Sequence, residues 1–326
     1  MPTRRATLAA GLALPMIATP AAAQAQPLRV IAFAGASNWP IWAGQAQGIF
    51  ARQGVEVALA FTPNSRALFR DMHEGRFDLA LTAIDNILAY NSGQGEEPLS
   101  GPADFAALFG VDNGLLSVMA QPEIESLQAL AGRSVSVDAM TTGFAFVLRE
   151  ILERAGVVDR VTFAAVGGGA QRLAALLEGR QAATLLNTPL DLAAEARGKR
   201  RLARAAEVIG AYQGVVGMVR RNRLEELRPR LVAFARAFRE SVAWCADPAN
   251  REGALSAFLA NQQGGTRPVA ERAHAALFDA ERGIYRDLRI DMQGLANVIA
   301  LRRKFGRDPG AADRHMDLSV RAAALA

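Results

Sequence analysis

The sequence has a single cysteine, Cys245, so no intrachain disulfide can form and no cysteine cluster exists for zinc or an iron–sulfur centre. The three histidines lie far apart in the chain and show none of the spacings typical of metal ligands. Only two of the 37 basic residues are lysines, Lys199 and Lys304, and both lie in basic runs expected at the surface. Schiff-base chemistry needs a desolvated lysine, which neither position offers. The sequence therefore predicts neither a metal site nor a cofactor.

Charge of one sign is not concentrated anywhere in the chain. The 37 basic and 32 acidic residues are interspersed, as at 148–150 and 223–226, and leave a formal net charge of +5. A nucleic-acid-binding protein usually gathers its basic residues on one face, so we expect no nucleic-acid partner. With 326 residues, of which 51% are hydrophobic, the chain is long enough for about two globular domains.

The N-terminus has the three parts of a secretory signal peptide. Residues 1–5 are positively charged, residues 6–18 are apolar, and small residues around Ala23 fit the A-x-A cleavage pattern. We therefore predict a signal peptide at 1–23 and export to the periplasm, without a lipid anchor because no cysteine follows the apolar stretch. The paired Arg4 and Arg5 leave the Sec and twin-arginine routes both open. No later stretch reaches the ~18 apolar residues of a membrane span.

The rest of the chain alternates between strand and helix patterns in two blocks. In the first block we expect strands at 28–33, 55–61, 78–82 and 106–111, with helices at 40–52, 66–74 and from 86. In the second we expect a short helix at 124–130, strands at 134–137, 161–164, 182–186 and 205–209, and helices at 143–155, 170–178 and 190–197. Four further helices are expected at 229–246, 250–260, 267–280 and 291–305. This order predicts an α/β protein with parallel sheets covered by helices.

Two α/β blocks followed by helices predict two lobes. We place the first lobe at 27–114 plus 216–326, which includes the C-terminal helices, and the second at 115–215. The extended segments 115–119 and 215–219 are predicted to be the two crossings between the lobes, flanked by glycines that can absorb hinge rotation. The carboxyl ends of the strands would then face one cleft, where α/β sheets usually bind ligands.

Three segments carry a family resemblance: SNWPIWA at 37–43, GIFARQGVEV at 48–57 and DLALTAIDN at 78–86. In order and spacing the chain resembles the substrate-binding proteins of ABC transporters, in the branch that includes the NMT1/THI5-like and the sulfonate, nitrate and taurine groups. The resemblance implies a type II periplasmic-binding-protein fold and capture of a small solute for import. It also implies an ABC permease in the inner membrane as partner, and we expect a monomer.

Candidate ligand-binding residues of the first lobe follow two of its strands. Ser37, Asn38 and Trp39 come after the first strand; Trp39 can stack on a planar ligand or pack in the core, and Asn38 can donate and accept hydrogen bonds. Asp85 and Asn86 precede a helix. Asp85 can cap that helix or, facing the cleft, accept a hydrogen bond from an N–H group of the ligand.

In the second lobe, Thr141, Thr142 and Gly143 open a helix. Two hydroxyls, free amides and the helix dipole make this start a candidate cradle for a carboxylate, sulfonate or phosphate, although either threonine can also simply cap the helix. The family uses the corresponding loop for ligand binding. The remaining candidates in the loops and next to the second crossing are Gly168, Asn187 and Tyr212.

Catalysis has little support in the sequence, because no G-x-S-x-G elbow and no metal-ligand set occur. We therefore predict a binding protein and not an enzyme. A planar group, an anion and an N–H donor together point to a heterocyclic or aromatic organic acid as ligand. Two alternatives remain: an enzyme similar to the family's pyrimidine synthase, whose cysteine-rich iron motif is missing here, and a sensor module that presents its ligand to a membrane receptor.

Overall fold

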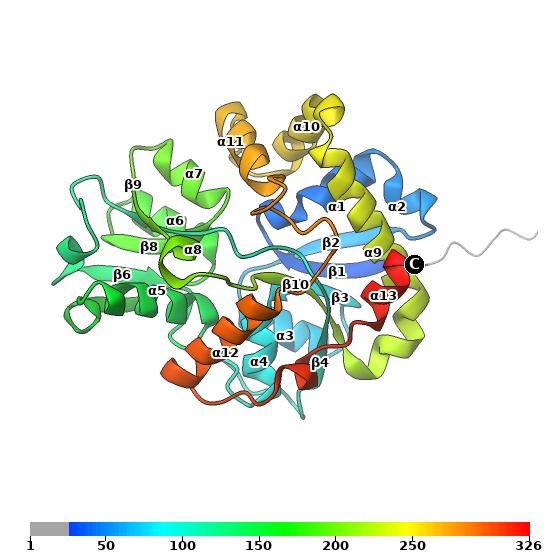
Figure 1. The fold of residues 1–326 in the computed structure, drawn as a ribbon, viewed down its shortest axis with the longest axis horizontal. Helices are drawn as coiled ribbons and strands as arrows, with labels where there is room; N and C mark the ends of the chain where they lie inside the picture. Colours follow the sequence, from blue (N-terminus) through cyan, green and yellow to red (C-terminus); the bar gives the residue numbers. More distant parts are fainter. Residues whose placement is uncertain (1–25) are drawn as a thin grey trace, which may run out of the picture.

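The computed structural model describes residues 26–326, so the predicted signal peptide lies outside the described residues. The chain forms two five-stranded sheets that lie side by side, each covered by helices (Figure 1). The first sheet has the order β2-β1-β3-β10-β4, with β1 (Leu28–Phe33), β2 (Val57–Thr62), β3 (Leu79–Ala83), β4 (Phe105–Gly110) and β10 (Val215–Arg220). The second has the order β7-β6-β8-β5-β9, with β5 (Leu116–Ala120), β6 (Ser134–Val137), β7 (Thr162–Ala165), β8 (Ala183–Asn187) and β9 (Arg200–Arg204).

Each sheet contains one strand that runs against the others. In the first sheet β1 is parallel to β2 and β3, whereas β10 is antiparallel to both of its neighbours, β3 and β4. In the second sheet β6 is parallel to β7 and β8, whereas β5 is antiparallel to β8 and β9. The sheets are therefore mixed and not all parallel, because each one takes in a strand at the point where the chain arrives from the other sheet.

The two crossings differ from the predicted ones. The extended segments 115–119 and 215–219 are largely strands β5 and β10 inside the sheets, so the chain crosses at 111–115 and at 210–214. The crossings touch, because a β-carbon on Gly214 would collide with the backbone of Gly114. The buried carboxylate of Asp112 joins them: its Oδ1 accepts the amide of Gly114 at 2.8 Å and that of Val215 at 3.0 Å. The two crossings thus form one narrow connection.

Helices from both ends of the chain cover the first sheet and share one apolar core. They are α1 (Trp39–Ala46), α2 (Ile49–Arg52), α9 (Leu224–Ala246), α10 (Arg251–Asn261), α11 (Arg267–Leu277) and α13 (Ser319–Leu325). The single helix expected at 40–52 is broken into α1 and α2, because Gly48 between them has φ of +65°, a conformation that ends a right-handed helix. Helix α9 begins five residues before the predicted start, with Pro229 inside it.

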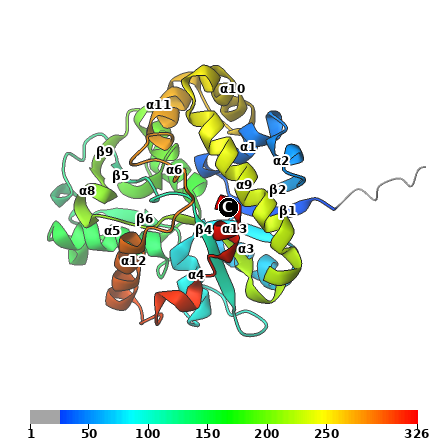
Figure 2. The same ribbon diagram turned by 45° about the vertical axis from the view of Figure 1, so that its right-hand side comes forward.

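A second apolar core extends from the other face of the first sheet to the second sheet. It includes α3 (Ser65–His73), α4 (Ile84–Asn91), α5 (Gly143–Arg154) and α12 (Met292–Phe305). Figures 1 and 2 both show α12 beside α4, which follows a strand of the first sheet, and beside α5, which follows a strand of the second. The C-terminal part of the chain is therefore packed against both halves of the molecule.

The edge of the second sheet differs from the prediction. Helices α6 (Gly169–Leu177) and α7 (Leu190–Glu195) form as expected, but 205–209 is helix α8 (Ala205–Ile209) and not a strand. The strand is β9, in the arginine-rich run before it, where Arg201 pairs with the buried Asp191 at 3.0 Å. Charged side chains are common on edge strands, where they discourage pairing with other chains. The helix expected at 124–130 is only a short 3-10 turn at Gln128–Leu130.

Within residues 26–326, no helix has the length and the apolar character that crossing a membrane requires. The same residues contain no group of three or more histidine, cysteine, aspartate or glutamate side chains arranged to hold a metal ion.

Candidate functional site

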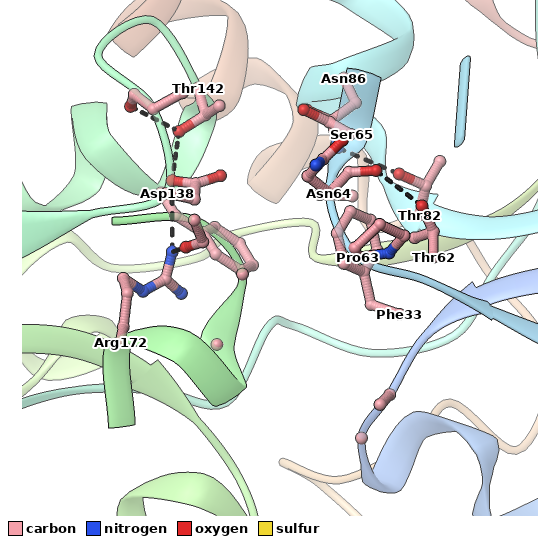
Figure 3. A pocket seen from close by; sticks show the side chains of 18 of the residues that line it. Phe33, Thr62, Pro63, Asn64, Ser65, Thr82, Asn86, Asp138, Thr142 and Arg172 are labelled. Carbon is pink, nitrogen blue, oxygen red and sulfur yellow. Dashed lines mark hydrogen bonds and ion pairs between the residues drawn. The ribbon is translucent and has the colours of Figure 1, made fainter. Parts of the chain in front are cut away.

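A cavity of about 630 Å³ lies between the two sheets. One wall comes from the carboxyl ends of β1, β2 and β3 and the segments after them, at 32–38, 62–66 and 81–86. The other comes from the segments after β6, β7 and β8, at 138–144, 165–172 and 187. Figure 3 shows the two groups of side chains facing each other across the cavity. The position at the strand ends and the volume are both typical of a site for a small molecule.

The lining combines apolar surface with many polar side chains, and its charges balance. Two arginines, Arg66 and Arg172, and two acids, Glu96 and Asp138, contribute to it. The amide and hydroxyl side chains are Ser37, Asn38, Thr62, Asn64, Ser65, Thr82, Asn86, Thr142, Gln171 and Asn187. Two half-buried aromatic rings, one from each wall, are those of Phe33 and Phe144. Such a lining can hydrogen-bond a polar ligand at many points while offering apolar faces to a planar part of it.

The two walls touch at the cavity's edge. A β-carbon on Gly168 would lie 2.9 Å from the carbonyl oxygen of Pro63, so the loop before α6 approaches the loop after β2 closely. Glu96, which follows α4, accepts hydrogen bonds from the hydroxyl and the amide of Thr141 on the opposite side. The two walls are therefore in contact at this edge of the cavity.

The structure brings together seven of the eleven residues that the sequence singled out. The lining includes Ser37, Asn38, Asn86, Thr142, Gly143, Gly168 and Asn187. They meet because each follows the carboxyl end of a strand, where the elements of the two sheets face one another. Their role in ligand binding stays a prediction. The other four, Trp39, Asp85, Thr141 and Tyr212, lie elsewhere.

Trp39 is a core residue, which contradicts the expectation that its ring stacks on the ligand. Its side chain is fully buried under α10 and α11, and its indole Nε1 donates to the carbonyl oxygen of Ala254 at 2.8 Å. Its ring centroid lies 4.3 Å from that of Phe258 and 5.5 Å from that of Phe278. Although Trp39 directly follows the cavity residue Asn38, the first turn of α1 directs the ring to the opposite side.

Asp85 neither faces the cavity nor caps α4 by a side-chain hydrogen bond. Its carboxylate, 1% exposed, forms a two-point ion pair with Arg302 of α12, at 2.8 Å to Nε and 2.5 Å to Nη2. Arg302 also donates to the carbonyl oxygen of Thr141 at 3.0 Å and lies over the ring of Phe146, with Cζ 5.0 Å from its centroid. This group ties α4, α12 and the start of α5 together behind the cavity.

Thr141 and Tyr212 are also displaced from the predicted site. Thr141 is exposed, and its hydroxyl contacts Glu96 at the cavity's edge. Tyr212 lies in the second crossing, where it is buried in the core that extends between the two sheets. Burial, reinforced by the charge of Asp85, raises the pKa of Tyr212 well above its ordinary value, so the phenol stays protonated.

Sequence reasoning missed all four charged residues of the lining, and two of them, Asp138 and Arg172, pair with each other on the second wall. Asp138 directly follows β6, and Arg172 lies in the first turn of α6, after the three glycines 167–169. They form an ion pair of 3.4 Å, with Arg172 almost fully buried and Asp138 about one quarter exposed. Burial raises the pKa of Asp138 and lowers that of Arg172, while each charge partly offsets the effect on the other. The position of Asp138 after a strand was the available signal.

The polar residues of the first wall are held by short hydrogen bonds. The Nδ2 atom of Asn38 donates to the carbonyl oxygens of Phe33 at 2.8 Å and Gly35 at 2.9 Å. Asn86 donates to the hydroxyl of Thr82 at 3.0 Å. Ser37 donates to Asp112 at 2.8 Å, which links the cavity directly to the two crossings. Groups of the protein itself therefore fix the orientation of these side chains.

The chain belongs to the NMT1/THI5-like family, whose sequence model matches residues 36–251. This confirms the resemblance noted in the sequence. No curated protein is similar enough to the whole sequence to count as a relative.

Several solved structures share the fold. One is the ligand-binding component of an ABC-type import system from Staphylococcus aureus, solved with zinc bound, with 18% identity, a TM-score of 0.74, and 92% of this chain and 99% of that chain covered. Another is the alkanesulfonate-binding protein SsuA from Xanthomonas axonopodis pv. citri bound to MOPS, with 17% identity, a TM-score of 0.71, and 93% and 99% covered. A third is the periplasmic nitrate-binding protein NrtA from Synechocystis, with 12% identity, a TM-score of 0.70, and 91% and 84% covered. The chain therefore has the fold of the substrate-binding proteins of ABC import systems.

Proposed function

We propose that this protein captures a small organic molecule in the cavity between its sheets and delivers it to an ABC importer. The observation that carries the proposal is the cavity of about 630 Å³, walled on both sides by polar side chains at strand ends. Sites of this kind hold a small ligand by apolar contacts, while a few placed polar groups fix its orientation. The narrow double connection between the halves supports binding by hinge closure.

Binding, and not catalysis, is the activity that the cavity supports. Within the described residues its lining contains no histidine, cysteine or lysine. The hydroxyl of Ser37 donates to the buried carboxylate of Asp112. It does not form the serine–histidine pair, oriented by a third group, that activates a serine nucleophile. We therefore propose that the protein returns its ligand unchanged.

The proposed ligand is a polar organic molecule with a planar part. Trp39 gives no reason to expect a planar part in the ligand, because its ring is buried in the core. The rings of Phe33 and Phe144 take its place, because they line opposite walls and are only half-buried. Aromatic rings of this kind favour stacked or edge-on contact with a flat ligand.

Delivery to an importer requires export of the protein. We propose that residues 1–23 are removed as a signal peptide during passage into the periplasm. Sequencing the N-terminus of the protein recovered from the periplasmic fraction is expected to begin at Gln24 or Gln26. Recovery of a cytoplasmic protein that retains Met1 would contradict both the location and the delivery.

A ligand of the proposed class is expected to raise the melting temperature of the purified protein, because it binds the native state alone. At 100 times the dissociation constant the stabilisation is about 2.7 kcal/mol. A thermal-shift screen of heterocyclic acids, aromatic carboxylates, sulfonates, pyrimidines and sugars checks this, followed by calorimetric titration for a 1:1 stoichiometry. Small-angle scattering of the same samples is expected to show a smaller radius of gyration with ligand. Failure of every class at millimolar concentration would contradict the proposed function.

A further inference from the structure

Two side chains on opposite walls of the cavity are buried and lack hydrogen-bond partners that their chemistry requires. They are Arg172 on the second-sheet wall, 3% exposed, and Asn38 on the first-sheet wall, 1% exposed. Buried polar groups are nearly always satisfied in native proteins, so each unsatisfied one calls for a physical reason. Both residues line the same cavity, although the unpartnered atoms themselves are closed off from water in this conformation. A ligand that turns these side chains slightly toward the cavity and supplies the missing partners is such a reason.

Arg172 has more donors than the protein uses. Its Nη1 makes both of its contacts, at 3.3 Å to the carbonyl oxygen of Gly167 and at 3.4 Å to Oδ1 of Asp138, and both distances are long. Its Nε is buried without any partner. A guanidinium carries five N–H donors and keeps its charge in a protein, so this one is left strongly under-satisfied. The anions that match a guanidinium by two parallel hydrogen bonds are carboxylates and phosphates, and a carboxylate brings the smaller negative charge of the two.

The backbone around Arg172 also favours an anion. Helix α6 has nine residues, its N-cap is Gly168, and no side chain caps it. No side-chain cap therefore competes with a ligand for the first amides and the dipole of this helix. The start of α5, which the sequence predicted to be the anion cradle, is different. The hydroxyl of Thr142 accepts a hydrogen bond from the amide of Ala145 at 3.4 Å and donates to Asp138 at 2.5 Å. The carboxylate of Asp138 thus lies at the start of α5, where it repels an anion.

Asn38 requires the opposite kind of group. Its Nδ2 donates to two carbonyl oxygens, those of Phe33 and Gly35, and these two acceptors fix which end of the amide is nitrogen. Its Oδ1 is therefore an acceptor, and it is buried without a partner. A hydrogen-bond donor on the ligand, such as N–H, satisfies it.

The charge balance of the second wall points to a ligand that carries both groups. Arg172 and Asp138 already form a neutral pair, and Asp138 remains about one quarter exposed. A simple anion would add an unbalanced negative charge beside Asp138, at a site that is mostly buried. A ligand that brings an ammonium group together with its acid leaves the site balanced, whereas one that brings a neutral N–H group supplies the hydrogen-bond donor but no balancing charge.

We propose that the ligand is a carboxylic acid that also carries an N–H donor, as amino acids and N–H heterocyclic acids do. Its carboxylate binds Arg172 and the start of α6, and its N–H group binds Oδ1 of Asn38. This inference rests on the proposed function and names the substrate class of the same cavity. It makes Arg172 the residue that selects for the acid.

The first arm of the test is a set of matched probes in a thermal-shift assay. It contains the common amino acids, pyrrole-2-carboxylate and indole-2-carboxylate, the corresponding amides, and acids without N–H such as cyclopentanecarboxylate and furan-2-carboxylate. Methanesulfonate, nitrate and neutral sugars complete the set. We expect the largest shift from a compound with both groups, and loss of the shift when either group is removed.

The second arm measures variants by calorimetric titration with the tightest compound of the set. Arg172→Gln is expected to weaken binding by about 10–100-fold, the value of a hydrogen-bonded charged group. Arg180→Gln is the matched control, because it removes the same charge from an exposed residue that follows α6 and lies outside the cavity lining; it is expected to change affinity by less than about 3-fold. The double variant Arg172→Gln/Asp138→Asn removes both charges, so it leaves no unpaired charge that could destabilise the fold. It is expected to lose affinity as well, which would show that the loss comes from binding and not from unfolding.

Three outcomes would each contradict one of these proposals. If the tightest compound lacks either the carboxylate or the N–H group, the ligand class is wrong while the binding function stands. If Arg172→Gln and Arg180→Gln bind that compound equally well, Arg172 does not hold the acid. If no compound of any class binds, the proposed function itself is contradicted.

Discussion

Replacement of Trp39 by alanine is expected to lower the free energy of unfolding by about 3–5 kcal/mol, because it removes a large, fully buried side chain from the first core. The ring contacts Phe258 and Phe278, and its indole N–H satisfies the carbonyl of Ala254, 215 residues away. Alanine leaves a void among these groups and an unsatisfied carbonyl oxygen. Urea unfolding, followed by circular dichroism, measures the loss.

Trp39→Phe is the control, since it keeps most of the ring and loses only the indole hydrogen bond and part of the volume. Its expected cost is about 1–2 kcal/mol. Both variants are expected to bind ligand with unchanged affinity when folded, because Trp39 is directed away from the cavity. A Trp39→Ala protein that melts like the wild type but has lost ligand affinity would show that the ring belongs to the site.

Replacement of Arg302 by methionine is expected to cost about 3–5 kcal/mol, because it leaves the carboxylate of Asp85 charged, buried and without its partner. Both side chains are almost completely excluded from solvent, at 0% and 1% exposure. The variant also loses the hydrogen bond to the carbonyl of Thr141, which connects α12 to the loop before α5. Denaturant unfolding measures the change.

The double variant Asp85→Asn/Arg302→Met tests the reason for this loss. It removes both charges, so it is expected to be clearly more stable than the sum of the two single losses predicts. Lys304→Met is the matched surface control, two residues further along α12: Lys304 pairs with Glu150 at 2.7 Å but is 43% exposed, so its loss is expected to cost about 1 kcal/mol or less. Strictly additive single losses would mean that the buried charge is not what destabilises Arg302→Met.

The predictions that the structure confirms most closely are those that rest on local pattern. Strands at 28–33 and 134–137 occur at the predicted residues, and α5 ends one residue before the predicted end. The sequence could also predict that four residues lie at the cavity: Ser37, Asn38, Asn86 and Asn187. Alternation of apolar and polar residues shows where a strand ends, and the strand ends of an α/β sheet meet at one edge. These features depend on neighbouring residues alone, so the sequence by itself determined them.

Only the tertiary structure decided which way the side chains in those loops face. Trp39 is buried because α10 and α11, formed more than 200 residues later, cover it, and Asp85 is turned from the cavity by Arg302 of α12. Nothing in the sequence distinguishes Arg172 from the many other arginines, and only the fold places it beside Asp138 and away from water. Strand β9 was hidden for a similar reason, since its arginines are accommodated by pairing with Asp191 and by an edge position. The burial and pairing of a charged or aromatic residue depend on partners far along the chain, and local periodicity carries no information about such partners.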